Sequence, residues 1–279
     1  MSGAVMTAVI FGALLHAGWN ALVRGGSDRF LDTVVIVAGA GLIAACCLPF
    51  APNPEETSWP YLAASVLVHV GYFTLLSLAY RKGELSFAYP IMRGTAPVFS
   101  AIAAAVLLKE SPSQGGWAGV LLISCGVVAL ARDSWRSGSF SPASAAYALA
   151  NAGVIVVYTL IDGLGARYSG APASYTAWMF VLTAILMLAA CFAGLRSNAA
   201  GYLRAHWTKC LVGGALILIS YSLALWAMTR APIALVAALR ETSVIFATII
   251  AAVFLRERIT RVRMASIVMV VAGAFAMRL

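Results

Sequence analysis

"IALVAALRETSVIFATIIAAVF", residues 233–254, is long and apolar enough to cross a membrane, yet it carries Arg240 and Glu241 side by side. About 20 apolar residues span the roughly 30 Å of hydrocarbon in a bilayer. A charge at the bilayer centre costs about 2.5–3.5 kcal/mol even on a lenient scale, so it usually faces a partner or a wet cavity. The stretch therefore predicts a membrane helix whose charged pair has a structural or functional role.

The composition of the whole chain indicates the same class of protein. Of the 279 residues 62% are hydrophobic and only 10% are charged, with a mean hydropathy of +0.92, whereas about a quarter of residues in soluble domains are charged. We therefore expect an all-α integral membrane protein with ten transmembrane helices. The ten apolar runs fall at about 4–23, 31–50, 59–80, 86–108, 113–131, 143–164, 173–194, 208–229, 233–254 and 261–278. The first lacks a preceding basic segment, so we expect it to be a retained helix.

The sequence also contains an internal repeat. An offset of 147 positions aligns "RGTAPVFSAIAAAVLLKE" (93–110) with "RETSVIFATIIAAVFLRE" (240–257). An offset of 142 aligns "LHAGWNALVR" (15–24) more weakly with "VYTLIDGLGA" (157–166), and it places Asn20 opposite Asp162. We interpret the chain as a duplication within a single membrane domain, with a first five-helix repeat at 1–135 and a second at 136–279.

Because five is odd, the second repeat must enter the membrane from the opposite side to the first. Inverted repeats of this kind are typical of secondary transporters, in which a site near the midplane opens alternately to the two faces. The sequence therefore predicts two inverted repeats around a central cavity and transport by alternating access. Lipid surrounds such a protein.

The basic residues favour a membrane topology over a nucleic-acid partner. The net charge is +9, but the basic residues occur singly at helix ends and form no basic face. Four lie in loops on the side of the two termini and thirteen on the other side, which with Arg93 and Arg240 accounts for all nineteen. By the positive-inside rule both termini face outward. We expect a multi-pass protein of the cell (inner) membrane.

Polar and aromatic side chains inside the predicted spans are the candidates for a binding site. Arg93, Asp162, Arg240 and Glu241 are charged, and the others fall in helix-spaced stripes that form semi-polar faces. The alternative is that the charges form ion pairs that only hold helices together. The candidate substrate-binding residues are His16, Trp19, His69, Tyr72, Tyr80, Arg93, Tyr158, Asp162, Trp226, Arg240 and Glu241.

Arg240 and Glu241 are expected to have different partners. Adjacent residues on one helix point about 100° apart. In the repeat Arg240 is matched by Arg93, but Glu241 is matched by Gly94. We therefore interpret the two arginines as a shared scaffold or a pseudo-symmetric carboxylate site. Glu241 is then an asymmetric addition that selects cargo or a proton.

These stretches resemble a known family. "LLHAGWNALVR" (14–24), "YPIMRGTAPVFSAIAAAVLLKE" (89–110) and "LVAALRETSVIFATIIAAVFLRERIT" (235–260) resemble EamA-type members of the drug/metabolite transporter superfamily, including YddG-like amino-acid exporters. The resemblance covers nearly the whole chain and implies a ten-helix basket with a central cavity that exports small metabolites. Many related transporters have both termini in the cytoplasm, opposite to the orientation that the charge count favours.

The favoured function is export of neutral or aromatic amino acids. The arginines offer guanidinium groups for a carboxylate, Glu241 or Asp162 offers a partner for an ammonium, and aromatic rings suit an apolar side chain. Export of amphipathic cations such as drug-like amines, with Glu241 or Asp162 as the main site, is the alternative, and proton coupling and a channel both remain open.

A membrane-embedded enzyme is the remote alternative. The chain contains neither an HExxH nor a GxSxG motif, so we expect no enzyme activity. The five cysteines show no metal-ligand spacing, and we expect no cofactor and no metal.

Overall fold

The computed structural model describes residues 1–26, 28–82, 85–132, 142–195, 199–254 and 260–278, with the side chains of all but 73–82, 85–88, 143–144, 194–195, 199–200 and 254. All regular structure in these ranges is helical, which confirms the all-α class. The long helices are α1 (Gly3–Arg24), α2 (Arg29–Cys47), α3 (Trp59–Lys82), α4 (Leu85–Ala103), α5 (Gln114–Ala129), α7 (Pro142–Tyr168), α8 (Pro172–Ala190), α10 (Trp207–Met228), α11 (Ile233–Arg240), α12 (Ser243–Phe254) and α13 (Arg261–Ala276). Short elements are η1 (Leu48–Phe50), η2 (Glu56–Ser58), the π-helices η3 (Ala104–Leu108) and η4 (Cys191–Leu195), and α9 (Ala199–Ala205).

Seven helical segments among the described residues are long and apolar enough to cross a membrane. They are Gly3–Arg24, Arg29–Phe50, Tyr89–Leu108, Ala145–Tyr168, Pro172–Ala193, Trp207–Met228 and Ile233–Val253. The chain is thus a multi-pass membrane protein, and the count of ten spans stays a prediction. The short helix α9 was not expected from the sequence.

Local sequence signals set many of the helix ends. Side-chain oxygens of Ser2, Asp28, Ser113 and Thr260 accept hydrogen bonds from backbone N–H groups of the first turns that follow them. Such N-caps satisfy donors that have no partner inside the helix. Gly170 follows the end of α7 with a φ of 61°, a left-handed conformation that glycine adopts without strain. The chain therefore turns where the apolar runs end.

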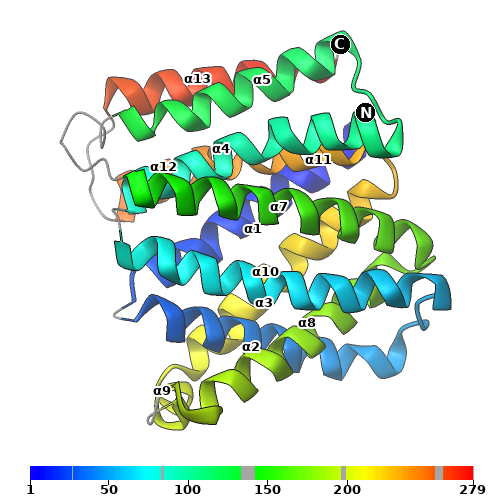
Figure 1. The fold of residues 1–279 in the computed structure, drawn as a ribbon, viewed down its shortest axis with the longest axis vertical. Coiled ribbons are helices and arrows are strands. Elements are labelled where there is room, and N and C mark those ends of the chain that lie inside the picture. Colours follow the sequence, from blue (N-terminus) through cyan, green and yellow to red (C-terminus); the bar gives the residue numbers. More distant parts are fainter. Residues whose placement is uncertain (27, 83–84, 133–141, 196–198, 255–259, 279) are drawn as a thin grey trace.

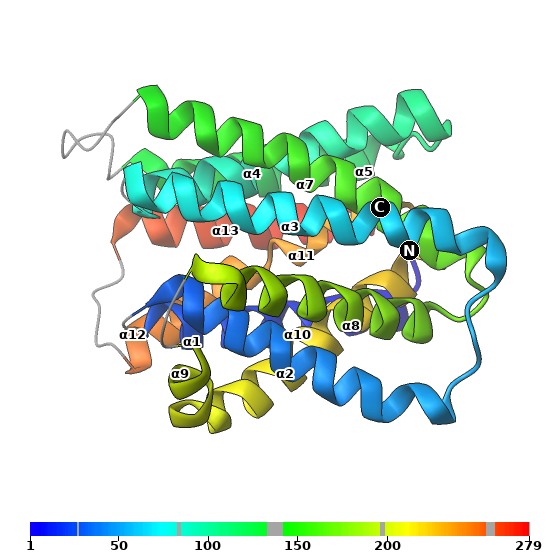
Figure 2. The same cartoon turned by 60° about the horizontal axis from the view of Figure 1, so that its bottom comes forward.

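The helices of the two predicted repeats pack in matching pairs. In chain order, α1, α2, α3, α4 and α5 of the first repeat correspond to α7, α8, α10, α11–α12 and α13 of the second. When each helix is replaced by its counterpart, the contact α2–α10 becomes α8–α3, α1–α10 becomes α7–α3, and α4–α7 becomes α12–α1, and all of these contacts are present. The contacts α5–α13, α2–α8 and α4–α11 each join a helix to its own counterpart. The two chain termini lie at the same end of the bundle (Figures 1 and 2). This pairing is what an exchange of the two halves would produce.

The stretch 233–254 is not one helix, so that prediction was wrong. α11 ends at Arg240 and α12 begins at Ser243, and the backbone between them closes tight turns. Glu241 N–H donates to Ala238 O over 3.0 Å and Ile245 N–H donates to Thr242 O over 2.9 Å, three residues back instead of the four of an α-helix. Apolarity gave no sign of this break, because the residues on both sides are equally hydrophobic.

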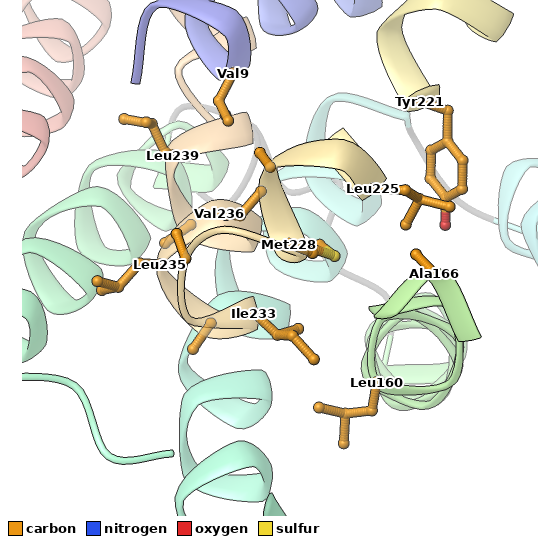
Figure 3. Packing of buried hydrophobic residues seen from close by; sticks show 14 of the residues in the cluster. Val9, Leu160, Ala166, Tyr221, Leu225, Met228, Ile233, Leu235, Val236 and Leu239 are labelled. Atoms are coloured by element: carbon orange, nitrogen blue, oxygen red, sulfur yellow. The ribbon is translucent and has the colours of Figure 1, made fainter. Parts of the chain in front are cut away.

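α11 lies at the centre of the main hydrophobic core. Ile233, Val236 and Leu239 are fully buried, and Figure 3 shows the α11 side chains together with Val9 of α1, Leu160 of α7 and residues of α10. Helices from both halves surround α11, so the break at its C-terminal end lies deep inside the bundle. This packing fixes the position of Arg240 and Glu241.

Glycines let α2 and α10 approach closely. A Cβ atom on Gly39 would lie 1.8 Å from the carbonyl oxygen of Cys210, and one on Gly214 would lie 2.5 Å from Ala40 N. Small residues at such positions bring helix backbones together in membrane bundles. The α2–α10 contact therefore depends on the absence of side chains.

We predict that Gly39→Ala lowers the free energy of unfolding by about 3 kcal/mol, because the helices must separate. Gly153→Ala is the matched control, since a Cβ there has nothing within 4 Å, and it should leave stability unchanged or slightly raised. Thermal unfolding in detergent measures both. Equal melting temperatures for the two variants would contradict the role of Gly39.

Candidate functional site

An ion pair between the two halves lies at the helix break. Arg93 of α4 donates from Nε to Glu241 Oε2 over 3.1 Å, and its Nη2 lies 2.8 Å from Oε1. Both residues are 4% exposed. Arg93 thus makes one hydrogen bond, from Nε, and one further close charge contact, from Nη2, to the same carboxylate. Glu241, which sequence matching left without a counterpart, is the partner of Arg93.

Arg240 has a different environment. It is buried, and its Cζ atom lies 4.9 Å from the ring centroid of Tyr221 on α10. In the described part of the chain no carboxylate contacts it. A cation over an aromatic face gains electrostatic stabilisation, but its five N–H donors call for acceptors. Arg240 is therefore a buried positive charge that can accept an anionic partner.

Packing explains why Arg240 lacks the pair that Arg93 has. The repeat matches Arg93 with Arg240 and Glu241 with Gly94, so the position equivalent to the partner of Arg93 is a glycine for Arg240. A Cβ atom on Gly94 would lie 2.6 Å from Val128 Cγ2 and 2.9 Å from Val128 N. No longer side chain fits against α5 at this point. The close contact of α4 with α5 therefore leaves the second arginine without a protein carboxylate.

The three charged residues share a small cavity. The void between its lining side chains is about 10 Å³, close to the space of one water molecule. Arginine, hydroxyl and aromatic groups face it together with apolar ones, the usual mixture of a ligand site. It is lined by Arg93, Ala96, Pro97, Ser100, Ile155, Tyr158, Thr159, Ala237, Arg240 and Glu241.

Asp162 lies beside this cavity in a separate polar cluster. Its carboxylate is fully buried, and it accepts hydrogen bonds from the hydroxyls of Tyr175 (3.4 Å) and Tyr221. His69 Nε2 lies 4.0 Å from Asp162 Oδ2, and His69 Nδ1 lies 2.9 Å from the carbonyl oxygen of Ser65. Tyr221 therefore links the two clusters, because its ring faces Arg240 and its hydroxyl binds Asp162.

Aromatic rings from α3 and α7 form one side of the site. The ring centroids of His69 and Tyr158 are 4.7 Å apart, and those of Tyr72 and Tyr158 are 5.7 Å apart in an edge-on arrangement. Tyr72 and Tyr89 also pack against the buried group around Met92. These rings give the site an apolar wall near Arg93.

The remaining candidates lie farther out or beyond what is described. Trp19 Nε1–H donates to His16 Nδ1 over 3.3 Å on α1, and His16 is buried within reach of the charges of Arg93 and Arg240. Trp226 instead lies under Arg230, 4.8 Å from its Cζ atom, and does not line the cavity. The side chain of Tyr80 lies outside the described residues.

Two further polar clusters lie at the ends of the bundle. At the end with the chain termini, Glu110 pairs with Arg167, and Ile233 N lies 3.4 Å from Glu110 Oε2. Arg167 also donates to Met228 O over 2.8 Å and to Ala231 O over 3.1 Å. These contacts join the ends of α7, α10 and α11 to the segment after η3.

At the opposite end, the fully buried carboxylate of Asp32 accepts from Lys209 Nζ over 2.6 Å and from the Tyr202 hydroxyl over 3.0 Å. The cluster ties the start of α2 to the start of α10 and to α9. Among the described residues, no three His, Cys, Asp or Glu side chains group as metal ligands would.

Sequence reasoning missed Tyr221, Tyr175 and Asp32. Tyr175 and Tyr221 reach Asp162 from 13 and 59 residues away, and no local spacing reveals such contacts. Asp32 is a charge inside the predicted run 31–50, so the test that singled out Asp162 would have found it. Tyr221 was passed over because the aromatic residue chosen on its helix was Trp226.

The sequence profile of the EamA-like transporter family matches residues 3–132 and again residues 143–279. The chain belongs to this family. It is therefore a membrane transporter, as the resemblance implied, and its family points to small-molecule substrates and not to enzyme activity. The two matched segments correspond to the two halves that meet at Arg93 and Glu241.

Solved structures support the fold. Their matches comprise 27 chains. One crystal structure of a protein aligns over 100% of this chain and 99% of its own, with a TM-score of 0.79 and 17% sequence identity. At that identity the likeness concerns the fold alone. No curated protein sequence matches the chain.

We predict that Glu241→Gln lowers the free energy of unfolding by about 3–5 kcal/mol, because it leaves the Arg93 charge buried without compensation. The double variant Arg93→Met/Glu241→Met should recover most of this loss, since both charges disappear. Thermal unfolding of the purified variants in detergent measures the difference.

Arg240→Gln is the control for this cycle. It removes a buried arginine that has no carboxylate partner, so its cost should be below half that of Glu241→Gln. A double variant no more stable than Glu241→Gln would contradict the pairing.

Proposed function

We propose that the protein exports small metabolites, most favourably neutral or aromatic amino acids, by alternating access through the central cavity, as a YddG-like carrier would. The single observation that carries the substrate class is Arg240, a buried guanidinium that faces the cavity without a carboxylate partner among the described residues. A cargo carboxylate supplies the missing acceptor as a charge-assisted, bidentate hydrogen-bonded pair.

The aromatic wall supports the choice of cargo side chain. Tyr158 lines the cavity, and the rings of His69 and Tyr72 back it. Aromatic side chains prefer edge-on or offset contacts with other rings and gain about 0.5–1.5 kcal/mol beyond burial. A phenyl or indole group beside Tyr158 extends this group of rings. Small polar cargo gains nothing there.

Glu241, Tyr158 and Ser100 are the groups in the cavity that can contact the ammonium of the cargo. Glu241 lines the cavity, but both its oxygens face Arg93. An ammonium near this pair meets a carboxylate that is already neutralised, so it contributes less than the contact with Arg240. The Tyr158 ring and the hydroxyl of Ser100, which has no hydrogen-bond partner in the described structure, offer further polar contacts.

Amphipathic cations are the second candidate, and Asp162 favours them. Its carboxylate is buried, and within the described residues it contacts no arginine or lysine. A cation that displaced the tyrosine hydroxyls could bind there. This route breaks the hydrogen bond from Tyr221 to Asp162, whereas Arg240 has no carboxylate partner among the described residues that cargo must displace, so we rank it second.

The matched packing of the two halves supports the alternating mechanism. The main contacts between the repeats have counterparts under exchange, and Glu110–Arg167 and Asp32–Lys209 join helices at opposite ends. Two halves with opposite orientation give two end states of similar energy. We infer that an inverted pair of repeats rocks about the centre where Arg93 meets Glu241.

We predict that wild-type protein in liposomes moves labelled L-phenylalanine or L-tryptophan, and that Arg240→Gln reduces uptake at least tenfold through loss of the carboxylate contact. Counterflow of a labelled amino-acid panel measures this. Arg230→Gln is the matched control, because Arg230 is an exposed arginine that also lies over a ring, that of Trp226, and it should transport normally.

A different result would redirect the substrate. If no amino acid moves while organic amines do, and if Arg240→Gln is tolerated but Asp162→Asn is not, the cation hypothesis replaces the first. Unchanged amino-acid transport in Arg240→Gln would overturn the role of Arg240.

Alternating access predicts exposure of the cavity from both sides in turn. In a variant without its five cysteines, we expect Ser100→Cys to react with an impermeant thiol reagent added from either side of oriented vesicles, and cargo should slow the reaction. Ser124→Cys, which is also buried but does not line the cavity, should stay unlabelled. Reaction from one side only would argue against alternation.

A further inference from the structure

Asp162 and His69 face each other with room for one more hydrogen between them. His69 Nδ1 lies 2.9 Å from the carbonyl oxygen of Ser65. The Ser65 hydroxyl oxygen lies 3.2 Å from the same nitrogen. Because a carbonyl only accepts, the contact with Ser65 O is a hydrogen bond when Nδ1 carries the ring hydrogen, and Nε2 then presents a lone pair toward Asp162 Oδ2 at 4.0 Å. This separation exceeds that of a hydrogen bond, and a proton bound to Nε2 would place a positive charge opposite the carboxylate.

The charges around the cavity balance only when nothing anionic is bound. Arg93 and Glu241 neutralise each other, and Arg240 is balanced by Asp162 when that carboxylate is ionised. A zwitterionic cargo adds no net charge. A monocarboxylate adds one negative charge inside the bundle, where an uncompensated charge is costly.

We propose that Asp162 together with His69 binds one proton whenever the cargo is a carboxylate without an amino group, so that the carrier also moves aromatic monocarboxylates, each with a proton. The proton comes from the solvent on the loading side and leaves with the cargo on the other side, and no covalent bond is formed. The proposal rests on the assignment of Arg240 as the carboxylate site.

Tyr221 couples the two sites. Its ring centroid lies 4.9 Å from Arg240 Cζ, and its hydroxyl donates to Asp162 Oδ2. A carboxylate bound to Arg240 adds a negative charge on the other side of this ring, and its repulsion of the Asp162 carboxylate favours uptake of a proton. Linkage is reciprocal, and a protonated Asp162 therefore strengthens carboxylate binding by the same factor, about a hundredfold if close to one proton is taken up.

The other groups that face Asp162 do not supply this proton. Helices from both halves pack on α7, and η2 touches only its far end near Ser169. Tyr175 and Tyr221 donate to Asp162, His69 on α3 lies 4.0 Å from it, and Tyr158 on the same helix interacts with it electrostatically. Tyr158 also interacts with Arg93 on α4, with Arg240 of α11 and with Glu241 directly after α11.

The test is proton uptake by the purified full-length protein in weakly buffered detergent, followed with a pH indicator dye as ligand is added. The probes are 3-phenylpropionate, which has a ring and a carboxylate, and L-phenylalanine, which adds the ammonium. We expect about one proton per bound 3-phenylpropionate and close to none per L-phenylalanine. The affinity for 3-phenylpropionate should fall by up to about a hundredfold from pH 6 to pH 8.

Asp162→Asn should abolish the uptake and bind 3-phenylpropionate at pH 8 as tightly as wild type does at pH 6. Asp32→Asn is the matched control, because Asp32 is an equally buried carboxylate that also accepts from a tyrosine hydroxyl, and it should behave as wild type. Tyr221→Phe covers the case in which Asp162→Asn does not fold. Tyr221→Phe removes a hydrogen-bond donor to the ionised Asp162 carboxylate, so tight binding of 3-phenylpropionate should persist to higher pH. The control Tyr202→Phe should leave the pH dependence of that binding unchanged.

The outcomes separate this proposal from the one on which it rests. If both probes bind wild type and lose binding in Arg240→Gln, but no proton is taken up, the carboxylate site stands and the proton site is wrong. Equal effects of Asp162→Asn and Asp32→Asn would also overturn it. If neither probe binds wild type, the Arg240 site itself fails, and the proton site fails with it.

Discussion

The ion pair between Arg93 and Glu241 is the interaction on which the centre of the molecule depends. Two charges taken out of water are expensive, and their attraction compensates only when the geometry is good and both stay paired. Here the partners come from different halves of the chain, so neither half can place its charge in the core alone. The interruption between α11 and α12 occurs where Glu241 turns toward α4, which gives the pair a fixed position between the repeats.

Duplication and divergence together produce the asymmetry of the site. Each half contributes one buried arginine, but close packing of α4 on α5 at Gly94 leaves room for only one carboxylate. The result is a neutral pair beside an unneutralised guanidinium, which the rings of Tyr221 and Tyr158 border on the cavity side. The proposed affinity for an anionic group would thus arise from a missing side chain in a repeated pattern.

The apolar runs and the repeat were enough to predict the class, the approximate helix ends and the family, because bilayer thickness and backbone hydrogen bonding constrain them strongly. The inner charges Arg93, Asp162, Arg240 and Glu241 were found by their cost in lipid. Their pairing was not predictable. Helix geometry predicted that Arg240 and Glu241 have different partners, and they do, but a break in the helix leaves no trace in hydropathy and was not predicted. Contacts of Tyr221 with Asp162 depend on tertiary packing alone.

The tie at Glu110 has a consequence for leakage. Arg167 donates to Met228 and Ala231 carbonyls while it pairs with Glu110, and Glu110 also lies against the first amide of α11. Separation of α7 from the neighbouring helix ends would break all these contacts together. If the carrier opens at this end, as the proposed alternating access requires, water and small ions would meet either the intact cluster or fully separated helix ends, with no partly open state held by the same contacts.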